Sequence, residues 1–145
     1  MKPETPACVF CSIIAGTAPA QDVTRYMTVT AFTPLNPVVG GHRLFVPNEH
    51  LIDAAHTPFR TGETFAIAAA WGELQGEQFN LITNNGPDAT QSVFHLHVHY
   101  VPRKANDGLP LPWFSGKSKA KPSDEQLAAE QWAHLRKYYV KGEQA

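Results

Sequence analysis

The chain has 145 residues and a mass of 16.0 kDa, which predicts one domain of ordinary size. Its 12 basic and 13 acidic side chains give a formal net charge of -1, which argues against a nucleic-acid-binding protein. Hydrophobic residues make up 43% of the chain, enough for a core, so wholesale disorder is excluded. No apolar run reaches the roughly 18 residues of a membrane span. Because Met1–Pro6 lacks the features of a signal peptide, we expect a cytoplasmic protein.

Apolar periodicity and turn residues predict the elements in chain order. They are a helical stub at Cys8–Ile14, strands at Val23–Tyr26, Thr28–Phe32 and Arg43–Val46, a short helical turn at Leu51–Ala55, a helix at Phe59–Leu74, strands at Phe79–Thr83 and Val93–Val101, an irregular stretch at Asn106–Pro122 and a last helix from Ser123 to about Tyr139. Ser123, with Gln126 three residues later, predicts a capping box that opens that helix. The fold class is α+β, with an antiparallel sheet of about five strands, a long helix and a C-terminal helix.

The only cysteines, Cys8 and Cys11, form a Cys-x-x-Cys motif. In a reducing compartment this spacing indicates half of a zinc site or a redox pair. A thioredoxin-like redox motif follows a buried strand, and no apolar strand precedes Cys8. Zinc is therefore the better interpretation, provided that two further ligands exist.

Three of the seven histidines alternate with apolar residues in His95-Leu96-His97-Val98-His99. Side chains at alternate positions of a strand share one face, about 6.5–7 Å apart. The three imidazoles are therefore expected on one face, with Leu96 and Val98 toward the core. This pattern favours either a metal held by His95, His97 and His99 or a nucleophilic, phosphate-binding cluster, over a solvated strand face.

The segment His95–Arg103 resembles the signature of the histidine triad (HIT) superfamily of nucleotide hydrolases and transferases. Cys8–Gly16 is similar to the opening of its Hint-like branch, Asn36–Pro47 to its second segment, and Asn84–Phe94 to the loop before the triad. The resemblance covers about residues 8–103 and implies one HIT domain over residues 1–145, with residues 104–145 forming an irregular segment and the C-terminal helix. It also implies a homodimer with a continuous sheet.

The resemblance implies that His97 attacks the α-phosphorus of a purine nucleotide or nucleotide conjugate and forms a nucleotidyl-histidine that water hydrolyses. The carbonyl of His95 would accept the Nδ1 proton of His97, and His99 would contact the non-bridging oxygens. The other implied nucleotide-binding positions are the polar residues His42, Asn84, Gln91 and Ser92 and an apolar slot of Val9, Phe10, Ile13 and Leu44. Because the net charge is only -1 and no apolar run is long enough to span a membrane, neither nucleic acid nor a membrane is among the expected partners.

The sequence departs from the family pattern at two positions. Pro34 stands eight residues before His42, where the family usually carries an acidic residue that binds the ribose hydroxyls. Thr90 replaces the glycine that commonly precedes Gln91, and threonine would be strained there if the backbone requires a positive φ. Ribose recognition and the conformation of this loop are therefore expected to differ.

The resemblance also completes the zinc site. Some bacterial members and the related uridylyltransferases add two histidines to the Cys-x-x-Cys pair, and these map to His50 and His95. The implied four-ligand site of Cys8, Cys11, His50 and His95 would be structural.

Four functions remain in competition. The leading hypothesis is a Hint-like hydrolase of nucleoside phosphoramidates or related conjugates. The same His97 would also serve a nucleotidyl transferase or phosphorylase acting on dinucleoside polyphosphates. A metalloenzyme using the three histidines is disfavoured because same-face strand positions splay apart, and the intact triad disfavours a non-catalytic nucleotide-binding module.

Overall fold

The computed structural model describes residues 7–110 and residue 133. All of the helices and strands named here lie in the compact unit that ends at Asp107. The elements in chain order are α1 (Val9–Ala15), β1 (Gln21–Arg25), β2 (Val29–Thr33), β3 (Arg43–Pro47), α2 (Pro58–Gln75), β4 (Gln78–Ile82), the 3-10 turn η1 (Pro87–Ala89) and β5 (Val98–Arg103). Within these residues, every helix is too short or too polar to cross a membrane. The predicted C-terminal helix falls outside the described residues, and the single-domain assignment of residues 1–145 stays a prediction.

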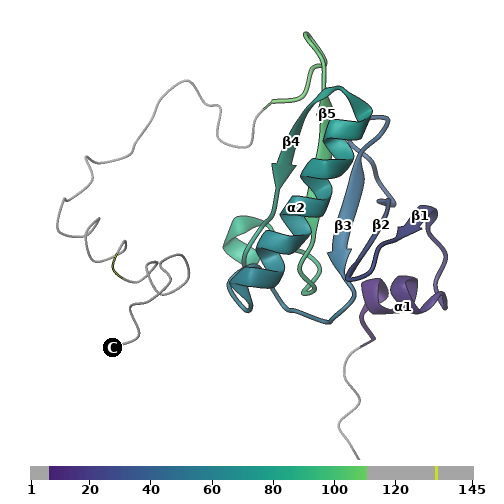
Figure 1. Ribbon diagram of the computed structural model, residues 1–145, viewed down its shortest axis with the longest axis vertical. Coiled ribbons are helices and arrows are strands. Elements are labelled where there is room, and N and C mark those ends of the chain that lie inside the picture. The colour runs from purple at the N-terminus through teal and green to yellow at the C-terminus, as the bar shows by residue number, and fades with distance from the viewer. Residues whose placement is uncertain (1–6, 111–132, 134–145) are drawn as a thin grey trace, which may run out of the picture. The chain divides into compact units, whose positions relative to one another are not determined.

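The five strands form one antiparallel sheet in the order β1-β2-β3-β5-β4, which confirms the α+β class and the HIT-like architecture. The long helix α2 lies across one face of the sheet (Figure 1). The C-terminal strand β5 is inserted between β3 and β4, so the residues that precede it are brought beside the end of β3.

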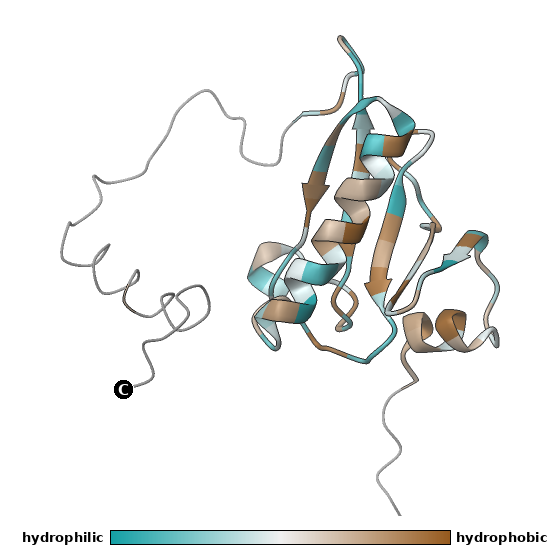
Figure 2. Cartoon of the chain, in the orientation of Figure 1, coloured by the Kyte–Doolittle hydropathy of each residue, from teal (hydrophilic) through white to brown (hydrophobic). Residues whose placement is uncertain are grey.

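Alternation along β3 divides the apolar side chains between two clusters on opposite faces of the sheet. Phe45 packs with Ala68 of α2 and with Tyr100 of β5 in one cluster. Leu44 and Val46 pack with Phe10 of α1 in the other. Figure 2 shows the corresponding apolar segments on β3, β4 and α1. The sheet is therefore buried on both faces, with α1 and α2 on opposite sides.

The helix α2 carries a glycine that its packing requires. A Cβ atom at Gly72 would lie 2.3 Å from Cε1 of Phe79, the second residue of β4. Gly72 lowers intrinsic helix propensity, but the close approach of the phenyl ring leaves no space for any larger residue. Helix and strand can therefore pack closely at this point.

The predicted strand Val93–Val101 is wrong at its start, because β5 begins only at Val98. In the register that pairs Phe45 with Val98, Leu96 would lie opposite Pro47, which has no N–H for the ladder. Leu96 instead donates its N–H to the carbonyl of Leu51 at 2.6 Å. His95 and His97 thus precede the strand, and only His99 lies on it. The three imidazoles still share the α1 side of the sheet, as predicted, because the rings of His95 and His97 both pack against Phe10 and the His97 ring lies 5.1 Å from that of His99.

The predicted helical turn at Leu51–Ala55 is also absent. The chain forms a hydrogen-bonded turn there, in which His56 donates its N–H to the carbonyl of Asp53 at 3.3 Å. The Asp53 carboxylate accepts the N–H groups of Ala55 and His56, both at 3.0 Å. An aspartate that bonds the backbone two residues ahead favours a turn over a helix.

Candidate active site and metal centre

His97 is held by two hydrogen bonds, one at its ring and one at its carbonyl group. Its Nδ1 lies 2.7 Å from the carbonyl oxygen of His95, and its own carbonyl accepts the Thr83 hydroxyl at 2.7 Å. A carbonyl oxygen can only accept, so Nδ1 carries the proton and Nε2 carries the lone pair. The ring is 6% exposed and packs edge-on against Phe10, with ring centroids 5.2 Å apart. His97 therefore presents one defined basic nitrogen.

The neighbouring imidazole of His99 has the opposite arrangement. Val38 donates its N–H to Nδ1 of His42 at 3.1 Å, and Nε2 of His42 lies 3.0 Å from Nδ1 of His99. Because Nδ1 of a neutral His42 is an acceptor, its Nε2 is the donor, and Nδ1 of His99 accepts. The remaining nitrogen of His99, Nε2, then carries a proton. The ring centroids of His97 and His99 lie 5.1 Å apart, so a ring that carries a hydrogen-bond donor packs beside the His97 ring.

Burial keeps these imidazoles neutral. Desolvation lowers the pKa of His42 and that of His97 below their usual value. The pKa of His99 falls to about 4 because of burial first, and then because His97 and His42 repel a third positive charge. At neutral pH the cluster therefore offers a lone pair on His97 and an N–H on His99, without a net charge.

The predicted polar residues of the loop before β5 differ in whether their side chains are already hydrogen-bonded. Gln91 is buried, and its amide donates to the carbonyls of Ile52 and Val93 at 2.7 and 3.1 Å while its oxygen accepts the Gly86 N–H at 2.8 Å. The NH2 group and the oxygen of the Gln91 amide are thus both engaged in holding the loop. Asn84 and Ser92, in contrast, make no side-chain hydrogen bond to the described part of the chain, so their polar groups are available to a ligand.

Thr90 stands where the family commonly has glycine, and its backbone is in the left-handed region, with φ of 67° and ψ of 23°. Its N–H donates to the carbonyl of Pro87 at 2.9 Å, which closes η1. A β-branched residue is strained in this region, and the hydrogen bonds of the loop impose the conformation. The backbone keeps a glycine-like path with a threonine in it.

The four residues of the implied apolar slot are placed unequally. Phe10, Ile13 and Leu44 are between 5% and 7% exposed and belong to the core cluster of the α1 face. Val9 is 49% exposed. The slot is therefore lined by edges of core side chains, and Val9 offers the only open apolar surface of the four. Pro34 is half-buried at the end of β2.

The two cysteines come together with two histidines from distant parts of the chain. The Sγ atoms of Cys8 and Cys11 and the Nδ1 atoms of His50 and His95 form a group in which all four ligand atoms lie within 4.8 Å of one another. Helix α1 brings the cysteines together, since the Cys11 N–H donates to Cys8 Sγ at 3.5 Å at the helix start. The four residues lie close enough to hold a metal ion.

The donor geometry fits a tetrahedral ion. Bonds of about 2.3 Å to sulfur and about 2.0 Å to nitrogen put neighbouring ligands about 3.5 Å apart at a tetrahedral angle. The sulfur–nitrogen separations are 3.4 Å for Cys8 and His95, 3.2 Å for Cys11 and His50, and 3.5 Å for Cys11 and His95. Nε2 of His95 donates to the carbonyl of Pro47 at 2.8 Å, so Nδ1 faces the sulfurs with its lone pair. Such an outer hydrogen bond is typical of a metal-bound histidine.

Without a metal, burial and the neighbouring Cys8 raise the pKa of the Cys11 thiol to about 11. Metal binding would therefore displace a proton from this group. His95, His97 and His99 do not converge on one point, since His95 is directed to the cysteines and Nδ1 of both His97 and His99 is engaged elsewhere.

Sequence reasoning missed three groups that anchor the histidines, two from the backbone and one from a side chain. The Val38 N–H, the Pro47 carbonyl and the Thr83 hydroxyl each orient one part of the histidine cluster. Main-chain groups leave no compositional signal, and Thr83 looks like an ordinary strand threonine. Only the position of Thr83, one residue before Asn84, could have indicated a role.

Comparison with known proteins agrees with this geometry. A family model described as the HIT domain matches residues 15–106. The chain therefore belongs to the HIT domain family.

The individual relatives extend this result. "Protein hit" of Bacillus subtilis is 33% identical over 126 residues, which cover 82% of this chain and 87% of the relative. "Adenosine 5'-monophosphoramidase hnt1" of Schizosaccharomyces pombe is 30% identical, over 74% of this chain and 83% of the relative. A HIT family protein from Bacillus anthracis has a solved structure with a TM-score of 0.70 and 34% identity, over 89% of this chain and 96% of that one. The family thus includes a protein named as a nucleotide phosphoramidase.

Proposed function

We propose that this protein hydrolyses nucleoside phosphoramidates or related nucleotide conjugates at the α-phosphorus, through a nucleotidyl intermediate on His97. The observation that carries the proposal is the opposed protonation of two adjacent imidazoles. His97 presents a lone pair on Nε2, while His99 presents an N–H. A nucleophile next to a fixed donor suits attack on a phosphorus whose oxygens gain charge.

In the first step, Nε2 of His97 forms a bond to the α-phosphorus, and the bond from phosphorus to the amine breaks. The amine leaves with the electron pair of that bond and takes a proton from water. The imidazole becomes positively charged, and its Nδ1–H donates to the carbonyl of His95 at 2.7 Å. Because a carbonyl dipole stabilises a cation, this hydrogen bond strengthens as the charge appears. The hydroxide left by that water then forms a bond to phosphorus, the bond from phosphorus to Nε2 breaks, the nucleoside monophosphate leaves, and His97 regains its lone pair.

The other polar groups bind and orient the phosphate in this proposal. Nε2–H of His99 donates to a non-bridging oxygen, and His42 keeps His99 in the required tautomer. Asn84 and Ser92 supply further hydrogen bonds, since their side chains have no partner within the described residues. Gln91 acts indirectly, by holding the Gly86 and Ile52 backbone. The purine would lie against Val9 and the exposed edges of Phe10, Ile13 and Leu44.

We further propose that the cluster of Cys8, Cys11, His50 and His95 holds zinc. Two thiolates and two imidazoles in tetrahedral spacing suit zinc better than the hard ions that prefer oxygen ligands. With four protein ligands the metal has no open position, so its contribution is to hold structure. His95 links the two sites, because its side chain belongs to this cluster and its carbonyl orients His97.

A nucleotidyl transferase would use the same His97, and the acceptor of the second step separates the two reactions. The support for hydrolysis is the named activity of the Schizosaccharomyces pombe relative. A homodimer with a continuous sheet and a cytoplasmic location stay predictions from the family resemblance.

The proposal is tested with adenosine 5'-phosphoramidate and the variant His97→Ala. We expect turnover to fall by at least about 10³-fold, because the attacking atom is lost, while AMP binding changes little. His56→Ala is the matched control, since His56 is exposed and lies outside both clusters. Retention of turnover in His97→Ala would contradict the assigned nucleophile.

A further inference from the structure

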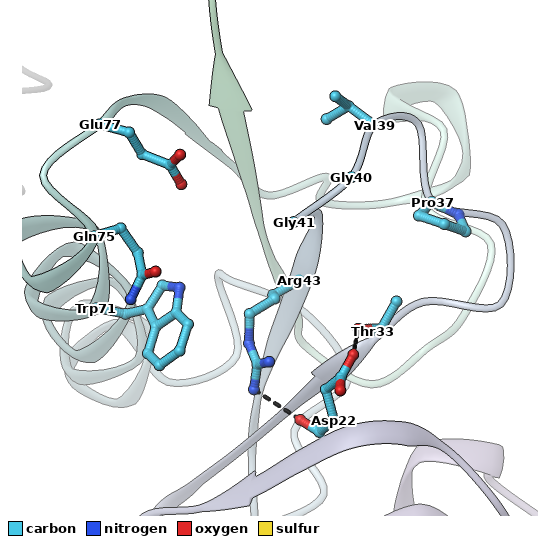
Figure 3. Close-up of a pocket in the computed structure, with 10 residues that line it drawn as sticks. All are labelled: Asp22, Thr33, Pro37, Val39, Gly40, Gly41, Arg43, Trp71, Gln75 and Glu77. Carbon is cyan, nitrogen blue, oxygen red and sulfur yellow. Dashed lines mark hydrogen bonds between the residues drawn. The ribbon is translucent and has the colours of Figure 1, made fainter.

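On the α2 face of the sheet the residues enclose a second pocket of about 230 Å³ (Figure 3). Its walls come from β1, β2, β3, the loop before β3 and the C-terminal end of α2. Arg43 lines this pocket, whereas the next residue, Leu44, packs on the α1 face beside Phe10. Consecutive strand residues point to opposite faces, so this pocket and the histidine cluster lie on opposite sides of the sheet.

The central side chain of the pocket is a buried arginine with incomplete hydrogen bonding. Arg43 is 7% exposed, and its Nη2 group donates to the Asp22 carbonyl at 2.8 Å and to the Thr24 hydroxyl at 3.1 Å. Its Nε–H is buried and has no hydrogen-bond partner. Within residues 7–110, none of the ion pairs involves Arg43. A buried donor on a charged group is costly to leave unpaired, so an oxyanion placed here would be stabilised.

An aromatic surface lies beside the guanidinium. The Arg43 Cζ atom is 4.7 Å from the centroid of the Trp71 ring, within the range of a cation–π contact. Pro37 and Val39 of the loop before β3 form the opposite wall (Figure 3). A ligand in the pocket would therefore meet one cationic group between apolar surfaces.

Two carboxylates at the rim restrict the charge of that ligand. Asp22 accepts the Thr33 hydroxyl through Oδ2 at 2.8 Å, and Glu77 accepts the Tyr100 hydroxyl through Oε1 at 2.8 Å. Each leaves its second oxygen without a hydrogen bond to the described residues, and both side chains are exposed. Figure 3 shows them on two sides of Arg43. A simple anion would be repelled by this pair, whereas a molecule that also carries an ammonium group would satisfy the arginine and a carboxylate together.

We propose that this pocket binds a small zwitterion of the α-amino acid class, with its carboxylate on Arg43, its ammonium group toward Glu77 and its side chain against Trp71. The volume lies just below the range of about 300–1,000 Å³ that is usual for ligand sites, which suits a molecule of amino-acid size. The site is independent of the proposed nucleotide chemistry, so either assignment can fail without the other.

The first experiment measures binding by the fluorescence of Trp71 in the full chain. The variant Trp113→Phe/Trp132→Phe leaves Trp71 as the only tryptophan. It is titrated to about 20 mM, a range that detects millimolar affinity, with phenylalanine, with 3-phenylpropionate, which lacks the amine, and with phenethylamine, which lacks the carboxylate. We expect a saturable change with phenylalanine, and at least about tenfold weaker binding of the other two.

Each other outcome overturns part or all of the proposal. Equal binding of phenylalanine and 3-phenylpropionate would show that the ammonium group makes no favourable contact and that the site binds carboxylates. Tighter binding of phenethylamine than of phenylalanine would show that Arg43 does not bind the carboxylate of the ligand. The absence of a saturable change with all three probes would overturn the proposal.

Substitutions then locate the two charges. Glu77→Gln keeps an oxygen that can accept the Tyr100 hydroxyl but removes the charge, so we expect phenylalanine to lose its advantage over 3-phenylpropionate. Glu73→Gln is the control, because Glu73 is an exposed carboxylate on α2 that does not line the pocket. Arg43→Lys should weaken phenylalanine binding about tenfold or more, since lysine lacks the guanidinium fork. If the buried Arg43 variant does not fold, the ratio measured for Glu77→Gln still decides, and an unchanged ratio contradicts the proposal.

Discussion

The histidine cluster and the cysteine cluster lie side by side and use imidazole in opposite ways. In the cysteine cluster, the Pro47 carbonyl binds Nε2 of His95 and leaves Nδ1 facing the sulfurs. In the histidine cluster, the His95 carbonyl binds Nδ1 of His97 and leaves Nε2 free. In our proposal, the same type of side chain therefore serves as a metal ligand in one region and as a nucleophile in the other. The backbone acceptor on the far nitrogen makes the difference, because it decides which nitrogen carries the lone pair.

The two clusters also differ in what would stabilise them. Cys8 and Cys11 are half-buried thiols that a metal would hold together. His97, His99 and His42 are held by hydrogen bonds and need no ion to keep their arrangement. Loss of the first cluster should therefore affect the stability of the fold most, and changes in the second should affect the chemistry most.

The largest effect on stability is expected from Cys11→Ser. The zinc content should fall from about one per chain to nearly zero, and unfolding free energy should drop by at least about 3 kcal/mol, because metal binding energy contributes to folding. Elemental analysis and chemical denaturation, each with and without chelator, measure both quantities.

Ser12→Ala is the control for that variant, since Ser12 is adjacent and its hydroxyl bonds only the Cys8 carbonyl. Turnover per folded molecule should fall less in Cys11→Ser than in His97→Ala. A wild-type protein without metal, whose two thiols react freely, would refute the metal site.

The next effect concerns acid stability of the histidine cluster. The pKa of His99 is about 4 in the folded chain, whereas the unfolded chain has the usual value near 6.5. As the pH falls, the unfolded state therefore binds a proton at His99 before the folded state does. The contribution of His99 to stability is fully present above pH 6.5 and is lost as the pH falls toward 4. This single group should cost about 2 kcal/mol between pH 7 and pH 5.

The groups that face His99 are His42 and His97, and its partners across the sheet, Leu44 and Ile82, carry no charge. His99→Gln should therefore show a smaller loss of stability between pH 7 and pH 5 than the wild type, measured by urea denaturation. Equal losses in the two proteins would show that His99 does not titrate in this way.

A smaller effect is expected at the ribose position. Without a carboxylate at Pro34, we expect AMP and 2'-deoxy-AMP to bind with affinities within about tenfold of each other. Pro34→Asp should restore about 1.5–3 kcal/mol of discrimination, or about 10- to 150-fold, because charge-assisted hydrogen bonds to both hydroxyls return.

Paired calorimetric titrations of wild type and Pro34→Asp measure this difference. Asn36→Ala tests the alternative, since Asn36 is exposed in the same loop and its side chain could replace the missing carboxylate. A preference of a hundredfold or more for AMP in the wild type would show that the loop already makes the contact.

The smallest effect is expected from Thr90→Gly. Thr90 has φ of 67°, where glycine is unstrained, so the substitution should stabilise the fold by about 1 kcal/mol despite the added entropy of the unfolded chain. Ala89→Gly is the control, because it introduces glycine at the neighbouring residue, the last of η1. Thr83→Gly is unsuitable, because the Thr83 hydroxyl bonds the His97 carbonyl. Thermal denaturation of both variants gives the comparison, and a less stable Thr90→Gly protein would contradict the strain.

The order and type of the described elements could be predicted because they depend on local pattern. The alternation of Arg43–Val46 and the helical spacing of Phe59–Leu74 indicated a strand and a helix, and both are present within two residues of the predicted bounds. The start of β5 could not be predicted, since Pro47 blocks the ladder only in the register that places it opposite Leu96. Glycine lowers helix propensity, and only the contact with the ring of Phe79 explains why α2 has glycine at position 72.

The sequence by itself determined which chemistry-bearing residues the chain possesses. The His-x-His-x-His pattern and the Cys-x-x-Cys pair carry their family resemblance in residue type and spacing alone. Only the tertiary structure decided which nitrogen of each imidazole is free, that Gln91 is engaged in its loop, and that Arg43 is buried beside Trp71 without an ion pair to the described residues. These properties depend on contacts between residues far apart in the chain, such as Val38 with His42 and His42 with His99, which local spacing does not encode.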